Sequence, residues 1–207
     1  MSLFKNLVYS GFVFCLLAIG PAVAFGQPEA NSRVEPSYEV SLQLLIGTND
    51  GAQRADFPKD LSAISQHLKS SFAFSNYRLS GTYLGRISNN GTFEYKSVDN
   101  LSGKESGANP QTFLEWSVIN LKSGATAKGP AGFQAQAFRF GARVPVTTAT
   151  VKDDTGKERP LVNYENIGLT LSKLGLQEGV PTLVGTLNLP GANDTIFLVM
   201  TVKSVDL

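Results

Sequence analysis

The sequence has almost none of the side chains that most often hold metals or act as nucleophiles. It contains one cysteine, Cys15, and one histidine, His67. A zinc site built from histidine and cysteine ligands needs several of them, so the composition excludes such a site. His67 lies beside the apolar stripe of a predicted helix. A partly exposed histidine is ordinary there, and we assign it no functional role.

An excess of charge of either sign is also missing. The chain has 18 lysines and arginines against 17 aspartates and glutamates, with no run of like charges. Nucleic-acid binding and electrostatic attachment to a membrane surface both depend on clustered basic residues. We therefore expect no nucleic-acid partner and no electrostatic membrane attachment.

The longest apolar run lies at the N-terminus. Lys5 precedes an apolar stretch over residues 7–19, and a triplet of small residues ends at Ala24, which is the layout of a secretory signal peptide. The stretch is shorter than the roughly 20 residues of a membrane-spanning helix. We predict a signal peptide over residues 1–24, cleaved after Ala24 or alternatively after Gly26. An uncleaved anchor is the competing interpretation.

Removal of this segment leaves about 180 residues, a length that suits a single domain. It also removes Cys15, and a cysteine-free exported chain is typical of bacteria, because small secreted eukaryotic domains often rely on disulfides. We expect the protein in the periplasm or at the outer-membrane periphery, or secreted. Residues 25–36 are polar and rich in proline, which predicts a flexible leader before a mainly-β domain over residues 37–207.

The motifs of several enzyme classes are missing as well. The chain has no Gly-x-Ser-x-Gly elbow, no phosphate-binding loop and no alternating acidic calcium loop. Asp153 and Asp154 are adjacent carboxylates, but neighbouring strand residues point to opposite faces, and "DDTG" is typical of a turn. We predict no catalytic residue, no metal and no cofactor.

Periodicity predicts the fold. Apolar and polar residues alternate from Tyr38 to Ile46, which indicates a half-buried strand. The period then changes to three and four, which predicts one amphipathic helix that covers a sheet face or end, with Asp56 as its cap and Pro58 in its first turn. The apolar positions of that stripe are Phe57, Leu61, Ile64, Leu68 and Phe72.

A hairpin is predicted after the helix. Tyr77, Leu79 and Tyr83 are expected on one face of its first strand, and Asn90-Gly91 is a favoured two-residue turn. Further strands are predicted at 113–121, 133–140, 144–151, 161–164 and 167–171. The fold class is therefore α+β, mainly β: an antiparallel sandwich or open barrel with one amphipathic helix near the N-terminus.

The chain closes with two apolar runs, 183–189 and 196–205. The first half of the last run is apolar on both faces, as in a central strand that is covered on both sides. We expect a terminal hairpin whose second strand lies inside a sheet, and loss of folding when the chain is cut before Thr195.

Three residues are the candidates for contact with a partner. Trp116 is the only tryptophan, and Arg139 and Arg143 are two basic residues that flank Phe140-Gly141-Ala142. Trp116, with Phe113 nearby, is a candidate for lining a groove for a sugar or peptide, although aromatic residues at strand spacing are more often core. The arginines fit an acidic partner, and equally a solvated sheet face.

Parts of the sequence resemble known exported proteins. "FPKDLSAISQHLKSSFAFSNYRLSGTYLGRI" and the closing "EGVPTLVGT" with its apolar strand are similar to a family of uncharacterised exported Gram-negative bacterial proteins. The closing stretch and the strand–helix–strand–strand opening also resemble the end and the small periplasmic modules of secretins, the ring-forming channels of secretion systems. The resemblance implies a noncatalytic envelope protein whose partner is another envelope protein. It assigns no residue a role.

Three functions agree with these observations. The first is a noncatalytic binding or assembly module of the envelope, associated with a secretion system. The second is a periplasmic hydrolase that uses carboxylates or a Ser/Lys arrangement from distant strands. The third is a small outer-membrane β-barrel, which needs about eight long strands with apolar residues facing lipid. The helical stripe and the non-aromatic Leu207 terminus favour the first.

Overall fold

The computed structural model describes residues 35–49, 57–101, 110–124, 132–152 and 154–205. The predicted signal peptide, most of the predicted leader, Asp56 and Asp153 lie outside these ranges. Residues 35–207 belong to one compact unit. Its elements in chain order are β1 (Ser37–Thr48), η1 (Lys59–Leu61), α2 (Ser62–Ser71), β2 (Asn76–Ser88), β3 (Gly91–Asp99), β4 (Thr112–Gly124), β5 (Gly132–Lys152), β6 (Glu158–Gln177), β7 (Thr182–Asn188) and β8 (Thr195–Val205).

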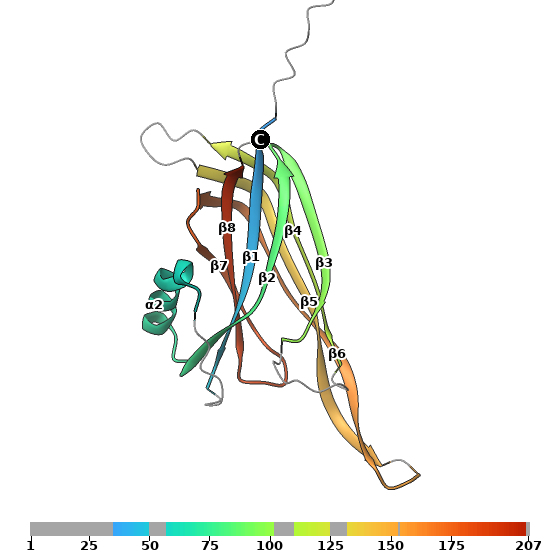
Figure 1. Ribbon diagram of the computed structural model, residues 1–207. Helices are drawn as coiled ribbons and strands as arrows, with labels where there is room; N and C mark the ends of the chain where they lie inside the picture. The colour runs from blue at the N-terminus through green and yellow to red at the C-terminus, as the bar shows by residue number, and fades with distance from the viewer. Residues whose placement is uncertain (1–34, 50–56, 102–109, 125–131, 153, 206–207) are drawn as a thin grey trace, which may run out of the picture. The chain divides into compact units, whose positions relative to one another are not determined.

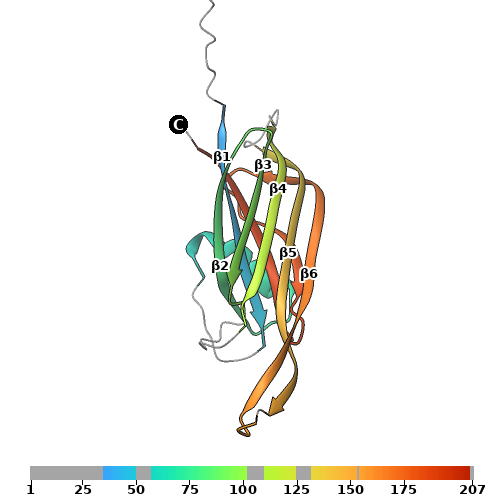
Figure 2. The ribbon, with the colours of Figure 1, turned by 90° about the vertical axis from the view of Figure 1, so that its right-hand side faces the viewer.

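The strands form two four-stranded antiparallel sheets. Sheet A has the order β2-β1-β8-β7, and sheet B has the order β3-β4-β5-β6. Figure 1 shows the two sheets facing each other, and Figure 2 shows the four strands of sheet B side by side. The mainly-β fold class with one short helix is confirmed, and of the two expected architectures the sandwich is the one found.

The main core lies between the two sheets. The predicted alternation of β1 is confirmed, because its inward side chains are all buried there: Tyr38, Val40, Leu42, Leu44 and Ile46. Sheet B contributes Trp116, Val118, Phe138 and Phe140 from its two central strands. Side chains at every second position therefore fill the space between two sheets, as a strand period of two requires.

The helix makes a third layer on the outer face of sheet A (Figure 1). Leu61, Ile64 and Leu68 are buried against Phe197 and other side chains of that face. Phe57 and Phe72 pack at the rim of this second cluster, so the whole predicted stripe is in contact. The prediction that the helix covers one sheet face is confirmed.

Strand β8 is central and buried on both faces. Every residue from Thr195 to Val202 is buried. Leu198 and Met200 face the main core, whereas Phe197 and Val199 face the helix. β7 pairs with β8 at the edge of sheet A. The interpretation of the closing run as a central strand within a terminal hairpin is confirmed.

The prediction that Tyr77, Leu79 and Tyr83 share one face is wrong. β1 and β2 pair Leu44 with Gly81 but Leu45 with Leu79, so Ser80 is an extra residue in β2. Such a bulge reverses the facing of every residue beyond it. Tyr77 and Leu79 consequently contact the helix cluster, while Tyr83 lies in the main core.

The predicted hairpin after the helix is also wrong. β2 and β3 follow each other directly, but they belong to different sheets. The two turn residues are Asn89 and Asn90 rather than Asn90 and Gly91. Asn90 takes a φ of 60°, and its backbone N–H donates to the carbonyl of Leu121 at 2.7 Å. Asparagine tolerates this left-handed conformation, which lets the chain cross from one sheet to the other.

Strands β5 and β6 are each continuous, where the sequence pattern predicted two shorter strands in each region. Gly141 and Ala142 do not break β5, because Gly141 stays in the ladder and pairs with Gly168 of β6. β4 pairs with β5 only as far as Arg143, whereas β6 continues to Lys152. The far end of this pair is therefore a two-stranded ribbon (Figure 1).

We expect Phe197→Ala to destabilise the protein by about 3 to 5 kcal/mol, the usual cost of truncating a buried aromatic side chain. The Phe197 ring is fully buried and lies 4.8 Å from that of Phe72 and 5.8 Å from that of Tyr77, measured between centroids. Urea unfolding followed by circular dichroism measures the change. Leu84→Ala is the control, since Leu84 is 59% exposed. Similar unfolding midpoints for the two variants would contradict the central placement of β8.

Candidate docking face

Sheet B has an outer face that no described element covers. Its outward side chains form three rows across the strands, each row following the pairing of β3, β4, β5 and β6. The first row is Val98–Phe113–Arg143–Asn166, the second is Lys96–Glu115–Gly141–Gly168, and the third is Glu94–Ser117–Arg139–Thr170. We call these three rows the docking face.

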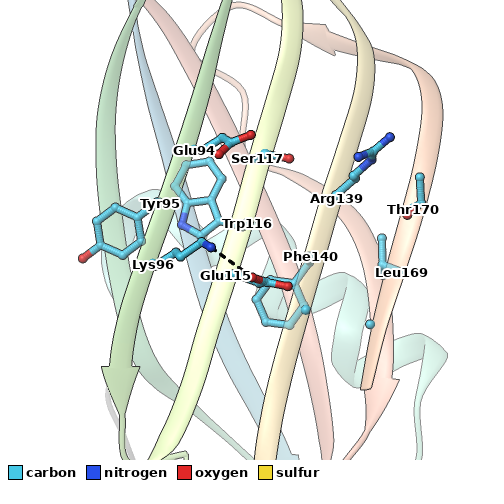
Figure 3. Close-up of a pocket in the computed structure, with 12 residues that line it drawn as sticks. Glu94, Tyr95, Lys96, Glu115, Trp116, Ser117, Arg139, Phe140, Leu169 and Thr170 are labelled. Carbon is cyan, nitrogen blue, oxygen red and sulfur yellow. Dashed lines mark ion pairs between the residues drawn. The ribbon is translucent and has the colours of Figure 1, made fainter. Parts of the chain in front are cut away.

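The docking face is hollowed along its middle row. Two depressions of about 540 Å³ and 640 Å³ lie on either side of that row and share Lys96, Glu115 and Gly141. We call the two depressions together the trough, and their lining residues come from all three rows. Figure 3 shows the part of the trough that lies between the middle and third rows.

The depth of the trough comes from two glycines. Gly141 and Gly168 are partners on β5 and β6, so the middle row has no side chains over half of its length. A Cβ atom added to Gly168 would lie 2.6 Å from the carbonyl oxygen of Phe140, which is backbone and cannot move aside easily. A Cβ atom added to Gly141 would meet only the side chain of Glu115, at 3.2 Å.

Arg143 of the first row packs beside two aromatic rings. Its guanidinium carbon lies 5.9 Å from the ring centroid of Phe113 and 5.6 Å from that of Tyr164. The two rings are 5.8 Å apart. Both distances are within the range of a cation–π contact. Phe113 is nevertheless 46% exposed, and so is its neighbour Val98. This cluster is the Arg143 clamp.

The charges of the docking face are unevenly paired. Lys96 Nζ lies 3.8 Å from Glu115 Oε2, and both side chains are more than half exposed, so this ion pair adds little stability. Figure 3 shows the pair as a dashed line and Arg139 on the next strand without one. In the described ranges neither Arg139 nor Arg143 has an acidic partner. Glu94 occupies the same row as Arg139, two strands away.

The structure separates the three residues singled out in the sequence. Arg139 and Arg143 are exposed on the outer side of β5. Trp116 instead lies in the main core and is 2% exposed, with its ring 5.0 Å from that of Phe93. Its indole nitrogen has no hydrogen-bond partner among the described residues. Tyr164 and Val98 were missed in the sequence, because their proximity to Arg143 depends on strand pairing.

The described residues show no metal-binding cluster and no membrane-spanning helix. They include no cluster of three or more histidine, cysteine, aspartate or glutamate side chains placed to hold a metal. His67 is exposed on α2. No helix in the described ranges is long and apolar enough to cross a membrane.

A polar cluster lies between sheets A and B. The hydroxyl of Tyr83 on β2 donates to Oδ2 of Asp99 on β3, and Arg78 donates to the carbonyl of Leu101. Burial, aided by the hydrogen bond to Asp99, raises the pKa of Tyr83 well above its usual value. Burial lowers the pKa of Arg78, against the attraction of Asp194 and Asp99. These contacts join strands that belong to different sheets.

Comparisons with known proteins give little more. No family model and no curated protein matches the chain. Among solved structures, the chain is similar to the Salmonella SPI-1 injectisome secretin InvG, with 13% identity and a TM-score of 0.36 over 84% of this chain and 66% of that one. It is also similar to the competence pilus secretin PilQ of V. cholerae, with 12% identity and a TM-score of 0.31 over 84% and 58%.

This similarity to secretins is faint, because TM-scores this low do not establish a common fold. The InvG β-barrel domain gives the same result, with 11% identity and a TM-score of 0.32. The chain spans between 46% and 66% of the length of the secretin chains that it matches.

The two trough glycines are expected to respond differently to alanine. Gly168→Ala should lower the free energy of unfolding by about 1 to 3 kcal/mol, because the backbone must shift to relieve the contact with Phe140. Gly141→Ala should stay within about 0.5 kcal/mol of the unaltered protein, because the exposed Glu115 side chain can move. Urea unfolding measures both. An equal loss in the two variants would contradict this account of the trough.

Tyr83 is expected to make stability depend on pH in the alkaline range. Its pKa is raised in the folded state, so its contribution is complete below about pH 10, where the unfolded chain ionises, and is lost as the pH rises from there through the folded pKa. Tyr83→Phe should therefore lower the free energy of unfolding at neutral pH by about 1.5 to 3 kcal/mol, the usual contribution of a hydrogen bond to a carboxylate. As the pH rises, the free energy of unfolding of this variant should fall less steeply than that of the unaltered protein.

Urea unfolding between about pH 8 and pH 11 compares the two proteins. The free energy of unfolding of Tyr83→Phe should still fall somewhat as the pH rises, because burial also raises the pKa of Tyr77. Tyr95→Phe is the matched control, since its ring packs beside Tyr83 at 5.5 Å between centroids. Parallel curves for the Tyr83→Phe variant and the unaltered protein would contradict a linkage through Tyr83.

Proposed function

We propose that the protein is a noncatalytic, exported binding or assembly module of the bacterial envelope, and that it contacts its partner through the docking face. The observation that supports this most directly is the difference between the outer faces of the two sheets. Sheet A carries α2 and the rim aromatic residues, whereas no described element lies over sheet B (Figure 2).

The composition of the docking face also supports a contact surface. Val98 and Phe113 are among the most exposed large apolar residues of the described chain, and they are neighbours in one row. Exposed apolar clusters with a polar rim are typical of protein interaction sites. Aromatic residues and arginine are the side chains that most often dominate binding energy at interfaces, and the Arg143 clamp combines them.

Export and the absence of catalysis rest on the sequence. Residues 1–24 have the layout of a signal peptide, and their removal leaves no cysteine and one histidine. The resemblance of the opening and closing segments to secretin modules makes a secretion-system component a natural candidate partner, within the wider class of envelope proteins.

Photo-crosslinking in intact cells tests this proposal. A photoreactive phenylalanine analogue is placed at Val98, in the docking face, in the full chain produced with its own N-terminus. We expect adducts with one envelope protein, or with a second copy of the chain, identified by mass spectrometry. The matched control places the same analogue at Gln66, which is exposed on α2 at the other side of the sandwich.

Adducts from position 98 that are absent from position 66 would support docking through sheet B. Cell fractionation in the same experiment reports whether the chain leaves the cytoplasm. No adduct from position 98, the same set of adducts from both positions, or retention of the full chain in the cytoplasm would contradict the proposal.

A further inference from the structure

We infer that the docking face binds an extended acidic segment of another protein, with one carboxylate on the Arg143 clamp and a second on Arg139. This inference rests on the proposed function and adds the chemistry of the partner. Arg143 lies beside two aromatic rings, Arg139 lies four residues away on the same face of β5, and bare backbone lies between them.

The clamp holds the guanidinium beside two aromatic rings and leaves it available for a carboxylate. The guanidinium carbon lies over the rings of Phe113 and Tyr164, at 5.9 and 5.6 Å from their centroids. A cation–π contact is an attraction to the ring face and not a hydrogen bond to an acceptor atom, so the N–H donors stay available to bind a carboxylate in a fork. No described acidic residue occupies these donors. The rings also reduce the rotamer freedom that a long side chain would otherwise lose on binding.

The two arginines match the repeat of an extended chain. Arg139 and Arg143 are four residues apart on one face of β5, which separates them by about 13 Å along the strand. An extended segment that lies along β5 repeats its own inward side chains at the same spacing. Acidic residues at positions i and i+4 of that segment would therefore meet both arginines at once.

The trough determines which kind of residue fits between the two acidic residues of the partner segment. Gly141 lies midway between Arg139 and Arg143, and its partner Gly168 is bare as well. A segment with a large apolar side chain at position i+2 would fill this space, whereas a small residue would leave it empty. The expected sequence signature of the partner is an acidic residue, any residue, a large apolar residue, any residue, and a second acidic residue.

The sequence of this chain does not contain that signature. Acidic residues four apart occur at Glu35 and Glu39, at Asp56 and Asp60, and at Asp154 and Glu158. Their central residues are serine, proline and glycine, so none carries a large aliphatic or aromatic side chain. The chemistry of the docking face thus favours a different protein over a second copy of this chain.

Binding of synthetic peptides tests the inference. The probe is a fluorescent, blocked peptide in which two glutamates flank a phenylalanine, separated on each side by one threonine. Its counterparts carry glutamine in place of both glutamates, or glycine in place of phenylalanine. We expect fluorescence anisotropy to show at least about tenfold tighter binding of the glutamate peptide than of the glutamine peptide, weakening as salt is added. The glycine peptide should bind less tightly than the phenylalanine peptide.

Variants of the full chain identify the contacts. Arg143→Gln should weaken binding of the glutamate peptide about tenfold, and Arg139→Gln should weaken it by less, because Arg139 is not held by aromatic rings. Arg143→Lys should recover little, since lysine has neither the planar fork nor the stacking geometry. Arg86→Gln is the matched control, because Arg86 is an exposed arginine on sheet A. Thermal melts of all variants should coincide.

Three results would overturn the inference: no binding of any peptide, equal binding of the glutamate and glutamine peptides, or equal weakening by Arg86→Gln and Arg143→Gln. Crosslinks from Val98 only to a second copy of the chain would overturn it too, while leaving assembly through the docking face intact. If no peptide binds but position 98 still gives a specific adduct with an envelope protein, this inference is wrong and the proposed function stands.

Discussion

Strand β8 packs on both of its faces, and the other layers depend on this arrangement. Alternate side chains of β8 enter the core between the sheets and the cluster beneath α2. A strand with eight consecutive buried residues, Thr195 to Val202, needs a cover on each side. Sheet B provides one cover and the helix the other. Phe197 is the point where this need is greatest, because it contacts three aromatic side chains at once.

The same constraint explains why the two outer faces differ. α2 is the only helix of more than one turn in the described ranges, and the apolar outer half of β8 and Leu45 of β1 require it. No described helix is left for sheet B. The outward positions of the second and third rows are accordingly polar or glycine, whereas the first row contains Val98 and Phe113. The exposed aromatic residue therefore lies where the fold has no cover of its own to offer.

Periodicity predicted what depends on one element at a time. The stripe of α2, the alternation of β1 and the two buried faces of β8 follow from local patterns, and all three are confirmed. The error in the facing of β2 arises where one residue changes the register. Ser80 reverses the facing of β2. Sheet B also has inward residues three apart instead of two in three adjacent strands, although their pairing register is unchanged there: Val118 and Leu121, Ala135 and Phe138, Leu171 and Leu174. Bulges depend on the partner strand and leave no fixed signature in a single sequence.

The candidate site was also predictable only where it depends on one strand. Arg139 and Arg143 share a face because four is an even separation in a regular strand, and that much is present in the sequence. Trp116 and Phe113 are three residues apart in one strand, an odd separation, so the ring that stayed near the arginines had to be Phe113 once Trp116 entered the core. Tyr164 reaches Arg143 only because β6 pairs with β5 in this register, with Pro145 opposite Tyr164. The clamp is therefore a property of three strands together, and the bare glycines beside it give a partner the space to reach it.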